Sequence, residues 1–103
     1  MRDGQQRVEV LQALAKLKYL VSKNNFILVN RRFPHAQAIT SNLAKIIINQ
    51  LQVRDFQKHE SDRDRLDEYV WVFKTEYGDI YYIKFKFIEN DRKVKFISFH
   101  LSN

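Results

Sequence analysis

The last third of the chain carries three apolar segments with the period-two alternation of β-strands. They are YVWVFKT at 69–75, DIYYIKFKFIE at 79–89 and KVKFISFHL at 93–101, and only three residues separate each from the next. Side chains alternate between the two faces of a strand, and short connections join antiparallel neighbours. These segments therefore predict an antiparallel sheet with one apolar face, and that face needs an apolar layer to cover it.

Two segments in the first half of the sequence are predicted to form the covering helices. The segment 7–23 has apolar residues at helical spacing, namely Val10, Leu14, Leu17 and Val21. A second helix is expected to begin after an N-cap at Thr40 or Ser41, with an inward face made of Leu43, Ile46, Ile47 and Leu51. Residues 26–30 predict a short strand, and the polar residues 58–68 predict a loop. We therefore expect one domain over residues 1–103, of the α+β class, with two N-terminal helices packed on one face of a small antiparallel β-sheet.

Composition and charge narrow the class of protein. The chain has no cysteine, so neither disulfides nor thiolate chemistry are expected, and no segment resembles a signal peptide or a membrane span. These features predict a cytoplasmic protein with no membrane partner. The net charge is +6, and residues 1–53 carry eight Lys or Arg against two acids. A polyanionic partner is expected from this charge, although a solvated surface would explain it equally well. No metal or other cofactor is expected, because ligand spacing is absent among the three histidines, His35, His59 and His100.

The turn between the last two predicted strands determines which of their side chains face one another. A three-residue loop keeps apolar residues together, because it places Phe85 opposite Ile97 and Ile83 opposite Phe99. A two-residue loop would mix the two faces. The same register places Tyr82 directly opposite His100 on the polar face, although a bulge could shift the pairing by one residue.

Groups suited to acid–base chemistry gather on this polar face. The last strand is predicted to place Phe96, Ser98 and His100 there, and Lys84 lies opposite Ser98. An imidazole titrates near neutrality, an ammonium group stabilises charge on a phosphate, and a phenol can donate a proton. This set predicts acid–base chemistry on an anion. The alternative is a polar sheet face that carries lysines for solubility.

Several short motifs occur in an order that resembles the MqsR (motility quorum-sensing regulator) family of type II toxin–antitoxin toxins. They are IT at 39–40, IIINQLQVRDF at 46–56, DRDR at 62–65, WVF at 71–73, YIK at 82–84 and ISFH at 97–100. The resemblance covers about residues 39–100. It implies a RelE-like fold and a metal-independent endoribonuclease that cleaves mRNA and is neutralised by a cognate antitoxin.

The resemblance also implies roles for individual residues. A basic family residue follows the DF pair that ends the second helix, and here Lys58 takes that place. The family tyrosine falls at Tyr82, and the C-terminal basic residue falls at His100. A further polar family position lies near residues 68–70, where Glu68 fits and Val70 would be a departure.

These residues suggest RNA transesterification through the 2′-hydroxyl group. His100 is expected to transfer a proton, as acid or as base, while Tyr82 orients the substrate or donates a proton. Lys58 and Lys84 are expected to hold the phosphate. Further RNA contacts are expected from Lys86, Arg63 and Arg65. For the DRDR loop, a network of salt bridges is the alternative interpretation.

Two further expectations concern partners. Exposed sheet edges and a cationic surface suit an antitoxin with an acidic surface, and a small helix-turn-helix protein is one candidate. A different class of function also fits the sequence. In that class the chain is a non-catalytic basic module that binds RNA or a partner, as a degenerate relative of the toxins.

Overall fold

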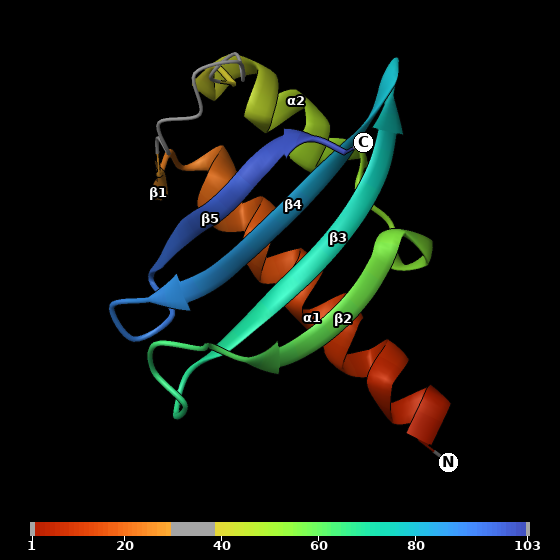
Figure 1. The fold of residues 1–103 in the computed structure, drawn as a ribbon, viewed down its shortest axis with the longest axis vertical. Coiled ribbons are helices and arrows are strands. Elements are labelled where there is room, and N and C mark those ends of the chain that lie inside the picture. Colours follow the sequence, from red (N-terminus) through yellow and green to blue (C-terminus); the bar gives the residue numbers. More distant parts are fainter. Residues whose placement is uncertain (1, 30–38, 103) are drawn as a thin grey trace.

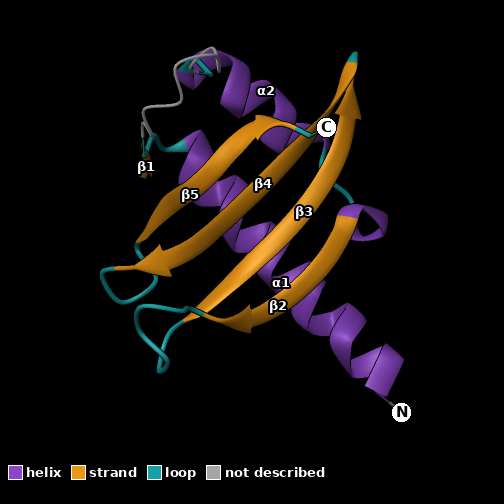
Figure 2. Cartoon of the chain, in the orientation of Figure 1, coloured by secondary structure: helices purple, strands orange, loops and turns teal. Residues whose placement is uncertain are grey.

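The computed structural model describes residues 2–29 and 39–102 of the chain. Two helices, α1 (Arg2–Ser22) and α2 (Ser41–Gln50), accompany a sheet of five strands in the order β1-β5-β4-β3-β2. The strands are β1 (Phe26–Leu28), β2 (Phe56–Ser61), β3 (Tyr69–Tyr77), β4 (Asp79–Ile88) and β5 (Lys93–Leu101), and a short 3-10 helix, η1 (Val53–Asp55), precedes β2. In Figure 1 α1 passes behind the sheet, so the viewer faces the side that the helices leave uncovered. Figure 2 shows the same two-layer arrangement by element type.

The sheet is mixed, which corrects the predicted antiparallel sheet. β1 runs parallel to β5, whereas the other neighbouring strands are antiparallel. The second correction is β2, because residues 58–61 were assigned to a loop and instead pair with β3. Five of the six residues of β2 are exposed, as in a strand at the edge of a sheet, so the segment lacks the apolar alternation that predicts a strand. The α+β class and the two helices are confirmed.

The hydrophobic core lies between the helices and the inner face of the sheet. On α1 the predicted apolar stripe is buried in full, as Val10, Leu14, Leu17 and Val21. On α2 the predicted N-cap is confirmed, since the Thr40 hydroxyl oxygen accepts a hydrogen bond from the Leu43 amide at 3.1 Å. Ile46 was predicted to face inward but is 50% exposed, whereas Ile48 is buried. Three consecutive isoleucines span more than half a helical turn, so one of them must point outward.

The hairpin between β4 and β5 pairs Tyr82 with His100 as predicted, although its loop and its register near the turn differ from the prediction. Its loop has four residues rather than three, which shifts the pairing near the turn by one residue. Phe85 therefore lies opposite Phe96 and not opposite the predicted Ile97. Phe96 is in the core at 1% exposure, so its predicted place on the polar face is also wrong. Ile97 is the extra residue of a β-bulge that shifts the pairing back. Tyr82 consequently lies opposite His100, as predicted.

Candidate functional site

The uncovered face of the sheet carries the predicted catalytic residues on three strands, β2, β4 and β5. We call it the open face and define its candidate catalytic cluster as Lys58, Tyr82, Lys84 and His100. Tyr82 of β4 pairs with His100 of β5, and Lys84 pairs with Ser98. The rings of Tyr82 and His100 are stacked, with 5.3 Å between their centroids and 20° between their planes. A phenol, an imidazole and an ammonium group therefore lie on the same face, in two successive cross-strand pairs of β4 and β5 on that face.

A hydrogen bond orients the imidazole of His100. Its Nδ1 atom lies 2.9 Å from the backbone oxygen of Leu101. A carbonyl oxygen only accepts hydrogen bonds, so Nδ1 carries a proton and Nε2 is the ring nitrogen left for a substrate. Nε2 can accept a proton when the ring is neutral and donate one when the ring is charged. The geometry thus suits both an acid and a base role for His100.

A second β-bulge brings Lys58 onto the open face. Phe56 packs on the core side, and because residues two apart in a regular strand share a face, a strand without a bulge would point Lys58 to the core side as well. Gln57 is an extra residue at this point, so Lys58 pairs with Val72 and points to the opposite side from Phe56. Lys58 and Lys84 both pair with Val72, from β2 and from β4. Their backbones are two strand spacings apart, which is about 10 Å. Both side chains are long, so their ammonium groups can lie closer together than their backbones do.

The one ion pair of Lys58 in the described part of the chain is weak. Its Nζ lies 3.3 Å from a Glu60 carboxylate oxygen, and the two side chains are 54% and 45% exposed. Exposed pairs of this kind contribute little to stability, typically about 0–1 kcal/mol. A phosphate group can therefore compete for the Lys58 ammonium at small cost.

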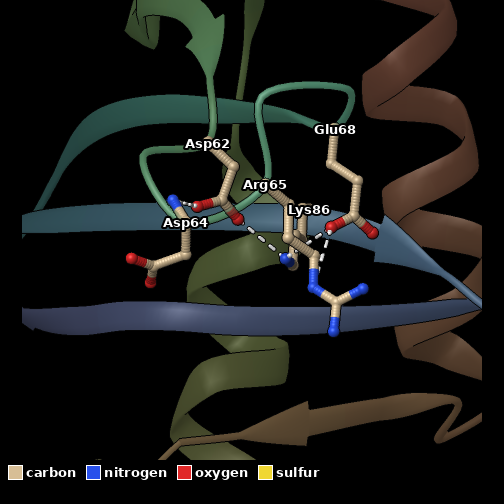
Figure 3. Close-up of polar contacts among 5 residues, drawn as sticks. All are labelled: Asp62, Asp64, Arg65, Glu68 and Lys86. Atoms are coloured by element: carbon tan, nitrogen blue, oxygen red, sulfur yellow. Dashed lines mark hydrogen bonds and ion pairs between the residues drawn. The ribbon is translucent and has the colours of Figure 1, made fainter.

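Lys86, one of the residues predicted to bind phosphate, contacts two carboxylates. Its Nζ lies 2.7 Å from Asp62 Oδ2 and 3.3 Å from Glu68 Oε2, both in the loop between β2 and β3 (Figure 3). The side chains of Lys86 and Asp62 are only 10% and 12% exposed. The hydrogen bond between them lowers the pKa of Asp62 and raises the pKa of Lys86, so both are charged at neutral pH. We call Asp62, Glu68 and Lys86 the loop anchor.

The DRDR segment forms part of a salt-bridge network. Asp62 belongs to the loop anchor, and Arg65 Nε lies 3.7 Å from the same Glu68 oxygen that faces Lys86. Figure 3 shows Arg65 beside the anchor. The side chains of Arg63 and Arg65 are exposed. The loop that holds the two anchor acids therefore also carries two exposed guanidinium groups, one of which contacts Glu68.

His59 lies on the opposite side of the sheet from the catalytic cluster. Its ring stacks on Trp71 at 3.7 Å with an interplanar angle of 11°, beside α1. Partial burial lowers the pKa of His59, and the negative charge of Glu9 opposes that shift. His35 lies outside the described residues. Within residues 2–29 and 39–102, no group of three or more His, Cys, Asp or Glu side chains is placed to hold a metal ion.

Comparison with known proteins identifies the family. Residues 10–101 match the family profile described as motility quorum-sensing regulator, toxin of MqsA. The chain belongs to this toxin family. The match includes most of α1, beyond the segment that carried the resemblance, and all four residues of the catalytic cluster. This toxin is thus part of a toxin–antitoxin system, and its family implies an antitoxin partner.

No curated protein and no solved structure matched the toxin significantly. In the part of the chain that the structure describes, no helix combines the length and the apolar character that crossing a membrane requires.

Proposed function

We propose that this toxin is an endoribonuclease that cleaves mRNA by metal-independent transesterification. The observation that carries the proposal is the stacked Tyr82–His100 pair beside Lys84 on the open face. A base removes the 2′-hydroxyl proton, and the 2′-oxygen attacks the adjacent phosphorus. The bond from phosphorus to the 5′-oxygen then breaks, and that oxygen takes a proton from an acid. The products are a 2′,3′-cyclic phosphate and a free 5′-hydroxyl.

Each residue of the catalytic cluster has a place in this reaction. His100 transfers a proton through Nε2, because its Nδ1 is held by the Leu101 carbonyl. Tyr82 lies against the same ring and either orients the RNA or supplies the second proton. Lys58 and Lys84 stabilise the charge that develops on the phosphate oxygens. A positioned acid or base typically contributes about 10²–10⁴-fold to the rate.

The proposal extends to the partner and to the place of action. Cleavage of mRNA implies action in the cytoplasm. The toxin carries a net charge of +6, and β2 forms one edge of the sheet. A cationic surface and an uncovered strand edge both favour an antitoxin with an acidic surface, for which a helix-turn-helix protein is a candidate.

Substitutions in the cluster separate catalysis from binding. We expect His100→Asn to lower the cleavage rate about 10²–10⁴-fold and Tyr82→Phe to lower it as well, with RNA affinity little changed. His59→Asn is the matched control, because it changes a histidine on the opposite face and should leave cleavage intact. If the wild-type toxin binds RNA but cleaves none, and the variants bind equally well, the non-catalytic binding module replaces this proposal.

A further inference from the structure

We infer that Lys86 is a positioning residue, which holds the loop between β2 and β3 through Asp62 and Glu68. In this position the loop presents Arg63 and Arg65 to RNA phosphates at a fixed place on β4, two residues from Lys84 of the catalytic cluster. The inference names RNA as the ligand and to that extent rests on the proposed function. Its structural part, the fixing of the loop by Lys86, does not depend on catalysis.

The setting of Lys86 is unusual for a lysine on a sheet face that no helix covers. It follows Lys84 by two residues on β4, so both side chains leave the same face. Lys84 is only partly buried, whereas the Lys86 side chain is 10% exposed and ends between two carboxylates (Figure 3). Lys86 also pairs directly with Lys95 of β5, an arrangement of like charges that is unfavourable by itself. The two carboxylates offset this repulsion and leave the Lys86 ammonium little access to RNA.

The loop above Lys86 is closed by its own hydrogen bonds. The Asp62 amide donates to the Glu68 carbonyl at 2.8 Å, and the Glu68 amide donates to the Arg65 carbonyl at 2.9 Å. The Asp64 amide donates to Asp62 Oδ1 at 2.9 Å, while Oδ2 of the same carboxylate faces Lys86. Asp62 thus joins the loop's internal turn to β4. Fixing this carboxylate fixes the backbone that carries Arg63 and Arg65.

The charges of the loop explain why RNA binding would need the loop anchor. Residues 62–68 hold four acids and two arginines, so an unattached loop would repel a polyanion. The anchor directs two of the acids, Asp62 and Glu68, onto Lys86. Arg65 still shares the Glu68 carboxylate with Lys86, and the acids of the loop that Lys86 does not contact are the exposed Asp64 and Asp67. Lys86 therefore assists phosphate binding indirectly, by arranging other charges.

Two double variants with the same charge change test this role. Asp62→Asn with Glu68→Gln removes the anchor acids, and Asp64→Asn with Asp67→Asn removes the exposed acids of the same loop. If only net charge mattered, both would bind RNA more tightly. We expect the control to bind more tightly and the anchor variant to bind more weakly. The probe is an RNA oligonucleotide with 2′-deoxy substitutions that prevent cleavage, and its affinity is measured over a range of salt concentrations.

The salt dependence and the loop amides give readouts that a general loss of stability would not mimic. Each phosphate contact on a single strand contributes about 0.7 to the slope of log affinity against log salt, so loss of both arginine contacts should lower the slope by about 1.4. Hydrogen exchange at the Asp64 and Glu68 amides should accelerate in the anchor variant. When Arg63→Gln and Arg65→Gln are already present, the anchor substitutions should cost no further affinity.

The outcomes separate this inference from the proposed function. Equal tightening by both double variants, or unchanged loop exchange, would overturn the inference even if the toxin cleaves RNA. Absence of cleavage by the wild-type toxin would refute the ribonuclease proposal, while the uncleavable probe still decides the role of the loop anchor. If the anchor double variant does not fold, Glu68→Gln alone is compared with Asp67→Asn. Weaker binding by Glu68→Gln supports the inference, and equal binding overturns it.

Discussion

Replacing Lys86 with Met should destabilise the toxin far more than the same replacement at Lys84. Lys86→Met leaves Asp62 without its cation at a site where the carboxylate is 12% exposed. Removing one partner of a buried ion pair typically costs about 3–5 kcal/mol. Glu68 is 34% exposed and can regain water, so we expect a loss of about 2–4 kcal/mol here. Lys84 forms no ion pair among the described residues and acts on Asp62 only weakly through its charge, so Lys84→Met should stay within about 0.5 kcal/mol of the wild type.

Thermal unfolding followed by circular dichroism measures this contrast. For a domain of this size, 1 kcal/mol corresponds to about 4–8 °C, so Lys86→Met should lower the Tm by roughly 10–30 °C and Lys84→Met by only a few degrees. Adding Asp62→Asn and Glu68→Gln to Lys86→Met removes the stranded charges and should restore part of the loss. Equal Tm values for the two single variants would refute the buried pairing of Lys86. So would a further loss, in place of recovery, in the triple variant.

Three other predictions concern pH and strand register. The pKa of Asp62 is lowered on folding from its ordinary value of 3.8, so the ionised carboxylate stabilises the fold above pH 3.8 and this contribution is lost as the pH falls through the lowered pKa. The difference in unfolding free energy between wild type and Lys86→Met should therefore narrow over that pH range. A constant difference in urea titrations would contradict this. The pKa of His59 is also lowered on folding, from 6.5, so the free energy of unfolding should decline as the pH falls from above 6.5 through the lowered pKa. This decline should be absent in His59→Gln. An equal decline in that variant would show that other groups cause it. Deleting Ile97 removes the bulge but keeps Phe96 opposite Phe85 and Ser98 opposite Lys84, so the variant should fold with a loss of about 1 kcal/mol, whereas a molten or unfolded variant would reject this register.

The side chains of β4 on the open face could be predicted from the sequence, because the alternation of faces along a strand is a local pattern. Strict alternation in β4 assigns Tyr82 and Lys84 to one face and Ile83 and Phe85 to the other, and no bulge interrupts the pairing of β4 with β3. The pairing of Tyr82 with His100 was predicted correctly although the turn was not. A four-residue loop and the Ile97 bulge shift the register in opposite directions, and their effects cancel at His100. Phe96 lies between the loop and the bulge, where the register is shifted by one residue, and its predicted face is therefore wrong.

Other features depend on contacts that no local pattern encodes. β2 is a polar edge strand, and the bulge at Gln57 that turns Lys58 outward has no signature in the sequence. The parallel pairing of β1 with β5 joins segments more than sixty residues apart. The loop anchor was equally hidden, since Lys86 has the same alternation and residue type as Lys84. Only the path of the loop between β2 and β3 distinguishes the two lysines.

Cleavage of an RNA with one 2′-deoxy nucleotide at the scissile position tests the central claim most directly. The purified toxin is given two oligonucleotides that differ only in that 2′-oxygen, with a chelator present in both reactions. We predict that the all-ribose strand is cut to a 2′,3′-cyclic phosphate and a 5′-hydroxyl, and that the substituted strand binds with similar affinity but stays intact at that bond. Cutting of the substituted strand at the same bond would contradict the assignment of 2′-hydroxyl attack to the Tyr82–His100 face.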